Sequence, residues 1–255
     1  MSTKFTQPIT IDAPGGDIVF DGVDFVDNGI VNIVTANSVT FRNCRFYNIA
    51  LDAMNKVSLI SDGSKSNTAG YKLVIENCYF GKSGAYNMIN LYQPLHDGSS
   101  FSHNYCKTNC ANDDRFSCYT AVKDAEYKFN GNEFEHYTHN GFQFSFRDDA
   151  DVVVNINDNM IGFPDPMLNY EDRGIARFRP FPNATTSFEH VVVNASGNKF
   201  AGEVDRIVWA QRKSEKDIVL TEENVPTYYL NGIATPMEIV DLTIPPMEFD
   251  DTDSE

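Results

Sequence analysis

The residues best suited to chemistry form a charged cluster in the middle of the chain. Arg147 and the carboxylates Asp148, Asp149 and Asp151 directly follow an apolar, strand-like run at 142–146. Carboxylates are ligands that calcium prefers, an arginine can neutralise an acidic sugar, and a base can remove the adjacent proton. These residue types suit elimination chemistry on an acidic polysaccharide. The same segment also fits a turn that carries solvated acids, and this is the interpretation we favour.

A second group of charges lies in the Pro-rich stretch at 162–187. Arg173 is the residue there that we would add to the elimination site, with calcium as a ligand only under that alternative. Its neighbours in the same stretch are Arg177, Arg179, Asp165, Glu171 and Asp172. A glycoside hydrolase would instead need two carboxylates facing each other at about 5 Å or about 6.5–9.5 Å. Acids are so abundant that the sequence cannot choose a pair, and otherwise no cofactor is expected.

Histidines and cysteines give no recognised metal-ligand spacing. His136 and His139 lie in a stretch with the pattern of strand and turn, where ordinary polar histidines are expected. Cys106, Cys110 and Cys118 lie close together, with His96 and His103 nearby. A zinc site could use such a set, but no C-x2-C pair is present. We therefore predict no metal site and expect reduced thiols.

Three tyrosines are candidates for stacking against sugar rings. These are Tyr86, Tyr92 and Tyr137, which the repeat described next does not require. Aromatic faces give sugars an apolar contact without needing any catalytic group. They predict at most a binding surface.

An eight-residue unit recurs along the chain and positions all of these residues. It alternates apolar and polar residues, continues with a turn-forming polar or glycine pair, and ends on an apolar, mostly aromatic residue. The clear copies are IVFDGVDF, VTFRNCRF, LVIENCYF, YKFNGNEF, VNINDNMI and VNASGNKF, which end at Phe25, Phe46, Phe80, Phe134, Ile161 and Phe200; SSFSHNYC and IVLTEENV, ending at Cys106 and Val225, are weaker.

This unit predicts an all-β fold, a right-handed parallel β-helix (solenoid) of about eight coils with inserted loops. Alternation buries one strand face, and Asn or Gly then allows the left-handed backbone of a sharp bend. We expect Asn43 to stack near Asn77 and to hydrogen-bond along the axis. The phenylalanines expected to form an internal ladder are Phe25, Phe46, Phe80, Phe134 and Phe200. An antiparallel sandwich would not need the units to recur in phase.

The predicted organisation has three parts. Residues 1–17 form an N-terminal cap, 18–225 the β-helix, and 226–255 an extended C-terminal arm with the acidic tail EFDDTDSE. Solenoid ends expose apolar core and open strand edges, so covering segments are expected.

The charge balance limits the classes of partner. Acidic residues number 36 and basic residues 20, giving a net charge of −16. Phosphate backbones and anionic membranes attract clustered Lys and Arg, so we predict no nucleic-acid partner and no membrane insertion. The N-terminal stretch has no apolar run of signal-peptide length, so we expect synthesis in the cytoplasm without general export.

The units VTFRNCRF, LVIENCYF and YKFNGNEF resemble the pectate-lyase-like right-handed β-helix superfamily over residues 18–225. Members include polysaccharide lyases, polygalacturonases and tailed-phage tailspikes, fibres and decoration proteins. The acidic chain without a signal peptide fits the phage branch. The resemblance implies a structural or interaction protein of a virion, a capsid decoration or fibre-type component. Its expected partners are other virion proteins, a homotrimer and a surface glycan. A carbohydrate-active enzyme and a non-catalytic glycan-binding β-helix remain the alternatives.

Overall fold

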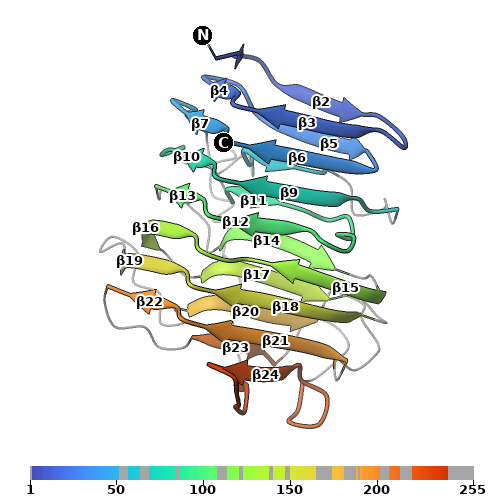
Figure 1. Cartoon of the computed structure of the whole chain (residues 1–255), viewed down its shortest axis with the longest axis vertical. Helices are drawn as coiled ribbons and strands as arrows, with labels where there is room; N and C mark the ends of the chain where they lie inside the picture. Colours follow the sequence, from blue (N-terminus) through green and yellow to red (C-terminus); the bar gives the residue numbers. More distant parts are fainter. Residues whose placement is uncertain are drawn as a thin grey trace, which may run out of the picture.

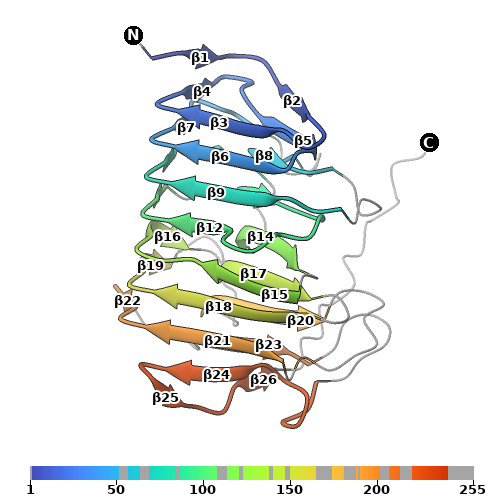
Figure 2. The same cartoon turned by 45° about the vertical axis from the view of Figure 1, so that its right-hand side comes forward.

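The computed structural model describes residues 2–51, 57–63, 69–83, 85, 87–107, 114–120, 123–137, 140–146, 150–164, 174–180, 188, 190–201, 207–212 and 220–240. Across these residues the chain winds through three sheets in turn and advances by one strand per sheet with each coil (Figure 1). Figure 2 shows the resulting column from a second side, with the N-terminal strands at one end and β24 to β26 at the other.

Within the described residues, sheet A holds eight strands, and sheets B and C hold nine each. Sheet A contains β1 (Lys4–Phe5), β4 (Asp24–Val26), β7 (Arg45–Tyr47), β10 (Tyr79–Phe80), β13 (Tyr105–Cys106), β16 (Glu133–Tyr137), β19 (Met160–Pro164) and β22 (Lys199–Phe200). Sheet B contains β2 (Ile9–Asp12), β5 (Val31–Thr35), β8 (Ile60–Ser61), β11 (Ile89–Asn90), β14 (Asp114–Thr120), β17 (Asn140–Phe146), β20 (Gly174–Pro180), β23 (Val208–Gln211) and β26 (Glu238–Val240). Sheet C contains β3 (Asp17–Asp21), β6 (Ser38–Arg42), β9 (Lys72–Glu76), β12 (Ser100–Ser102), β15 (Lys123–Lys128), β18 (Asp151–Asn157), β21 (Val191–Ser196), β24 (Thr227–Leu230) and β25 (Ile233–Ala234).

The pairing confirms the predicted all-β parallel β-helix of about eight coils. Strands one coil apart pair in parallel, as in Val39↔Leu73 and Phe41↔Ile75 between β6 and β9. The described pairs include one antiparallel exception, the hairpin of β24 and β25 at the C-terminal end. Side chains alternate along each strand, so one residue points into the coil and the next points outward. Residues that pair in register point the same way, as the buried pair Phe41 and Ile75 shows.

Each coil bends from sheet C into sheet A through one residue with left-handed backbone. The φ angle at this position lies between 53° and 66°, a region that glycine enters freely and that Asn and Asp tolerate better than other residues. The residues at this bend are Gly22, Asn43, Asn77, His103, Gly131, Asp158 and Gly197. The bend explains why the sequence unit carries Gly, Asn or Asp before its aromatic end.

The internal amide ladder lies one residue beyond that bend, in the later coils. Asn132 Oδ1 accepts from the backbone N–H and from Nδ2 of Asn104, at 3.0 and 3.1 Å. Asn159 Oδ1 accepts the same two hydrogen bonds from Asn132, and Asn198 Oδ1 accepts them from Asn159. Each Nδ2 also donates to a backbone carbonyl of the preceding coil; for Asn132 this is Phe101 O, at 2.8 Å.

The expected pair Asn43 and Asn77 therefore holds a different position from this ladder. Both residues are at the bend, and Asn43 Nδ2 donates outward to Asp21 at 2.9 Å. In their coils the ladder position is taken by Cys44 and Cys78, whose thiols donate to Phe20 O and Phe41 O.

Phenylalanine rings stack where the repeat supplies them in consecutive coils. The ring centroids of Phe25 and Phe46 are 4.4 Å apart, and those of Phe46 and Phe80 are 4.9 Å apart. Phe134 and Phe200 lie in the same row of sheet A, but Cys106 precedes Phe134 and Ile161 separates it from Phe200. The row is thus continuous as a buried core and aromatic only in part.

Strand pairing extends into both terminal parts. β1 and β2 lie within the segment expected to be a cap, and they pair with β4 and β5. At the other end, β24 pairs with β21, and β26 pairs with β23. The described part of the C-terminal arm thus continues the sheets, while the acidic tail lies outside the described residues.

Candidate functional site

Most of the charged cluster predicted from the sequence falls outside the described residues. This holds for Arg147, Asp148, Asp149 and Arg173, and also for Tyr86. Other residues that the sequence singled out and that fall there are Asp165, Glu171, Asp172, His139 and Cys110. Asp151 is described: it opens β18 as an exposed residue and pairs in register with Lys123. The elimination site therefore remains a prediction.

Arg177 and Arg179 lie on the outward face of β20 in sheet B. The Arg177 guanidinium donates to Gln143 Oε1 on β17 and lies over the Trp209 ring on β23, 5.8 Å from its centroid. Arg179 Nε donates to Ser145 Oγ at 2.9 Å. Gln143, Arg177 and Trp209 thus form one row across β17, β20 and β23.

The row on sheet B is nevertheless closed to solvent. Gln143 is 3% exposed, Arg177 4% and Trp209 0%, although all three point away from the coil interior. A ligand could reach Arg177 only after the structure opened there. We therefore look for a binding site elsewhere.

The outward face of sheet C carries an open polar groove. It has a volume of about 540 Å³ and crosses β9, β12 and β15. Its floor consists of the small outward residues of the middle strand, Ser100 and Ser102, which pair in register with Val74 and Glu76 of β9. On the other side Ser100 pairs with Lys128 of β15. Short side chains between longer ones create the depression.

The rim of the groove mixes charges of both signs. It is lined by Lys72, Glu76, Asp97, His103, Glu126, Lys128 and Asn130. Glu126 and Lys128 form a weak ion pair at 3.8 Å with side chains 52% and 58% exposed, and Glu126 accepts from Asn155 Nδ2. Exposed ion pairs of this kind contribute little to stability, so they can exchange their partners for a polar ligand.

The two glutamates at this rim do not have the spacing of a hydrolase pair. Glu76 follows Val74 by two residues and Glu126 precedes Lys128 by two, while Val74 and Lys128 flank Ser100. With about 3.3 Å per residue and about 4.8 Å per strand, their Cα atoms lie roughly 16 Å apart. Paired catalytic carboxylates lie within roughly 5–9.5 Å. With Cα atoms this far apart, the two glutamates would reach a hydrolase spacing only if both side chains pointed toward each other.

Tyr92 belongs to a polar corner after β11. Its hydroxyl accepts from Asn90 Nδ2 at 3.2 Å, and its side chain is half-buried. The backbone N–H groups of Tyr92 and Gln93 donate to the buried carboxylate of Asp62, at 2.6 and 2.8 Å. Burial raises the pKa of Asp62 to about 7, against these hydrogen bonds and one from Tyr71.

Tyr137, the third predicted sugar contact, is the last residue of β16. Its side chain lies outside what the structure describes. Of the three tyrosines, the structure describes the side chain of Tyr92 alone. That side chain lies in the polar corner after β11 and does not line the groove.

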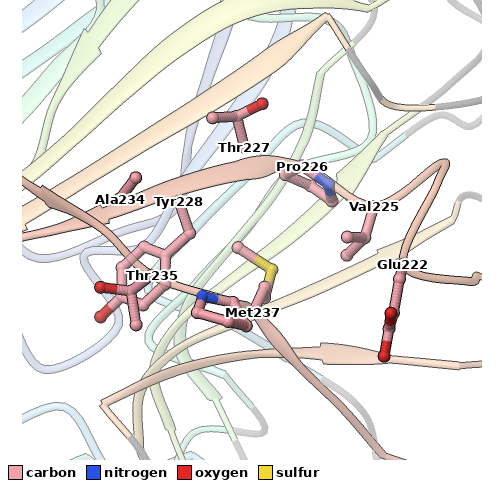
Figure 3. Close-up of a pocket in the computed structure, with 9 residues that line it drawn as sticks. Glu222, Val225, Pro226, Thr227, Tyr228, Ala234, Thr235 and Met237 are labelled. Carbon is pink, nitrogen blue, oxygen red and sulfur yellow. The ribbon is translucent and has the colours of Figure 1, made fainter.

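A second cavity, of about 410 Å³, lies at the C-terminal end between β24 and the segment after β25 (Figure 3). Its apolar lining includes Val225, Pro226, Pro236 and Met237. Tyr228 is 5% exposed there, and burial raises its pKa to about 12. The cavity offers one phenol in an apolar lining and no reactive pair among the residues that line it.

Metal and membrane features were examined over the described part of the chain. No three His, Cys, Asp or Glu side chains converge there in a way that could hold a metal ion. The described residues also contain no helix with the length and apolarity that crossing a membrane requires. Of the carboxylates on which the calcium expectation under the elimination alternative rests, Asp151 is described, and Asp148 and Asp149 lie outside this part.

Comparison of the chain with protein-family models, with curated proteins and with solved structures gave no match.

The groove and the Asp62 corner were not predicted from the sequence. The groove residues come from three coils, and only the register of β9, β12 and β15 shows that short side chains face long ones. One available signal was the SSFSHNYC unit, which has serine at both outward positions, whereas the clear units have a larger residue at one or both of them.

Proposed function

We propose that this chain is a structural or interaction component of a tailed-phage particle, a capsid decoration or fibre-type surface protein made in the host cytoplasm. The observation that carries the proposal is the unbroken row of sheet A from β1 to β22, which supplies one buried position per coil. A column bonded along its whole length resists local opening, as a surface module of a particle requires. The repeat resembles the pectate-lyase-like β-helix superfamily, and the acidic chain without a signal peptide favours the phage branch of that superfamily, which is why we propose a phage particle.

The partners under this proposal are other virion proteins and copies of the chain itself, as a homotrimer. The net charge of −16 favours a basic docking surface on the neighbour. Charges on the two docking surfaces speed association more than they strengthen the complex. Because salt screens these charges, docking should weaken as the salt concentration rises.

The deciding experiment is purification of the protein from its natural source, followed by sizing and mass spectrometry of the associated chains. Co-purification in a fixed ratio with a multi-megadalton particle supports the proposal. A free monomer or trimer with no particle-associated fraction contradicts it.

A second candidate, non-catalytic glycan binding, is favoured by the groove on sheet C. Its serine floor and charged, hydrogen-bonding rim suit a polar oligosaccharide that is bound and released unchanged. Ser100→Tyr would fill the floor and should abolish saturable binding on a glycan array. Thr40→Tyr is the matched control, because Thr40 occupies the same outward row two coils away and lies outside the groove. Binding that survives Ser100→Tyr removes the groove as the site.

A further inference from the structure

Cys44 and Cys78 occupy equivalent positions in neighbouring coils. On one side of them Arg42 pairs in register with Glu76, and on the other Arg45 pairs with Tyr79. The two cysteines are therefore direct neighbours across the coil interface, with Cα atoms about 4.8 Å apart. Disulfides form when Cα atoms lie about 4.4–6.8 Å apart, so the spacing of the coils permits closure once the thiols rotate away from their carbonyl acceptors.

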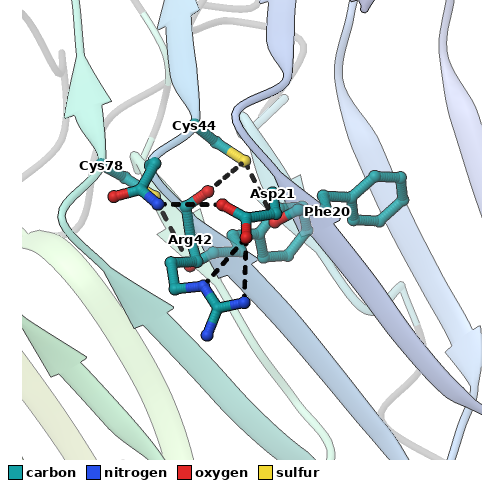
Figure 4. A network of polar contacts seen from close by, with 7 residues as sticks. Phe20, Asp21, Arg42, Cys44 and Cys78 are labelled. Carbon is teal, nitrogen blue, oxygen red and sulfur yellow. Dashed lines mark hydrogen bonds and ion pairs between the residues drawn. The ribbon is translucent and has the colours of Figure 1, made fainter.

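Each thiol points toward a backbone carbonyl of the preceding coil (Figure 4). Cys44 Sγ donates to Phe20 O at 3.4 Å and to Arg42 O at 3.3 Å. Cys78 Sγ lies 3.5 Å from the carbonyl oxygen of Phe41. The interaction between the two side chains lowers the pKa of Cys44 and raises that of Cys78. One member of the pair thus ionises more readily, while the other keeps its proton.

Both thiols are nearly closed to solvent. Cys44 is 0% exposed and Cys78 2%. A bulky alkylating reagent or a protein oxidoreductase cannot reach either sulfur without unfolding the coil. A molecule of the size of water can enter through ordinary fluctuations of the outer strands.

We propose that Cys44 and Cys78 form one oxidation site, which a small hydroperoxide converts into a disulfide joining two neighbouring coils. The Cys44 thiolate attacks one peroxide oxygen and breaks the O–O bond, leaving a sulfenic acid and hydroxide, which takes up a proton to form water. The Cys78 sulfur then attacks the sulfenic sulfur and breaks its S–O bond. The thiol proton leaves with that oxygen as a second water, so two thiols lose two electrons and the peroxide gains them.

This site gives the chain two forms with one fold. In a reducing cytoplasm the thiols stay reduced, and outside it the disulfide closes the loop from Cys44 to Cys78. Such a bond lowers the entropy of the unfolded chain and so stabilises the folded one. The inference does not depend on the proposed function, because it uses only the register and the thiol contacts.

The experiment uses the full chain carrying Cys106→Ser, Cys110→Ser and Cys118→Ser, so that only the pair remains. After treatment with hydrogen peroxide we expect the intact mass to fall by two hydrogen atoms. Non-reducing digestion should link the peptide that contains Cys44 to the one that contains Cys78. The thermal midpoint should rise, and it should return to its starting value after the chain is unfolded, reduced with dithiothreitol and refolded. Adding Cys78→Ser should abolish both the link and the rise.

Three results would overturn the inference. One is a folded chain that stays fully reduced in peroxide, and another is accumulation of sulfinic acid on either cysteine without a link. The third, which only the wild-type chain can show, is a link from Cys78 to Cys106 in place of Cys44. If the triple variant does not fold, the same digestion of the wild-type chain decides, because the linked peptides identify the pair.

Discussion

Asn132 accepts two hydrogen bonds from Asn104 through a single oxygen atom. The backbone N–H and the Nδ2 of Asn104 both converge on Asn132 Oδ1, at 3.0 and 3.1 Å, while Asn132 Nδ2 donates to Phe101 O at 2.8 Å. Both asparagines are 1% exposed. One side chain therefore satisfies the polar groups of two coils where water cannot replace it.

The first prediction is that Asn132→Ala destabilises the fold by about 3 kcal/mol. The substitution leaves the Asn104 N–H and the Phe101 carbonyl buried without their partner, and each such group costs about 1–3 kcal/mol. Urea unfolding followed by circular dichroism measures the change. Asn28→Ala is the control, because Asn28 is exposed, and it should stay within about 0.5 kcal/mol of wild type. A loss below about 1 kcal/mol for Asn132→Ala would show that the ladder is not a stability element.

The second prediction concerns the point where cysteine replaces asparagine in the ladder. Cys78 Sγ donates to Phe41 O as Asn132 Nδ2 does to Phe101 O, and the backbone N–H of Cys78 donates to Asn104 Oδ1. Cys78→Asn should extend the ladder by one coil and raise the free energy of unfolding by about 1 kcal/mol, the net value of one added hydrogen bond. Cys78→Ala removes the donor without replacing it and should lower stability. If both variants lose stability equally, the two positions are not equivalent.

The fold could be predicted from the sequence because interactions within each copy of the repeat determine the path of one coil. Alternating residues, a left-handed bend and a buried aromatic follow from a single unit of eight residues, so each copy indicates the same coil. The asparagine ladder was predicted one position too early, at Asn43 and Asn77, because these residues stand out in the Asn-Cys-x-Phe unit. Both residues form the bend instead. The later units SHNYC, NGNEF, NDNMI and SGNKF all carry Asn one residue further on, and that alignment contained the signal.

The candidate groove and the closed row on sheet B could not be predicted in the same way. Gln143, Arg177 and Trp209 are neighbours only because β17, β20 and β23 pair in one particular register. The insertions between them differ in length, so no fixed spacing identifies the row. Their burial was equally hidden, because an outward position on a strand normally meets solvent.

The third prediction uses the bend position. Gly22 has φ +66°, and the space where its Cβ would lie is open, while Asn43 and Asn77 adopt φ 54° and 53° in the equivalent place. Gly22→Asn should therefore be nearly neutral in thermal unfolding. Gly22→Val should cost about 1–2 kcal/mol, because a β-branched residue is strained at positive φ. Equal effects of the two substitutions would argue that contacts other than backbone conformation determine the residue at this bend.

The last prediction concerns Asp62, whose carboxyl is 1% exposed and accepts the N–H groups of Tyr92 and Gln93. Burial raises its pKa from 3.8 to about 7 in the folded chain. Between these values the folded state holds a proton that the unfolded state has lost. Stability from this group is therefore complete below about pH 4 and declines as the pH rises through 7, by up to about 4 kcal/mol.

Asp62→Asn removes that titration, so the difference in unfolding free energy between variant and wild type should shift in favour of the variant from pH 5 to pH 8. The absolute stability of the variant also reflects a lost acceptor, since an amide presents one oxygen to two N–H groups. The pH trend of the difference is therefore the quantity to measure, by urea unfolding at several pH values. Asp97→Asn, which removes an exposed carboxylate that accepts the Glu126 N–H, should keep the wild-type trend. Parallel profiles for Asp62→Asn and wild type would mean that Asp62 stays ionised in the folded chain and that its hydrogen bonds outweigh burial.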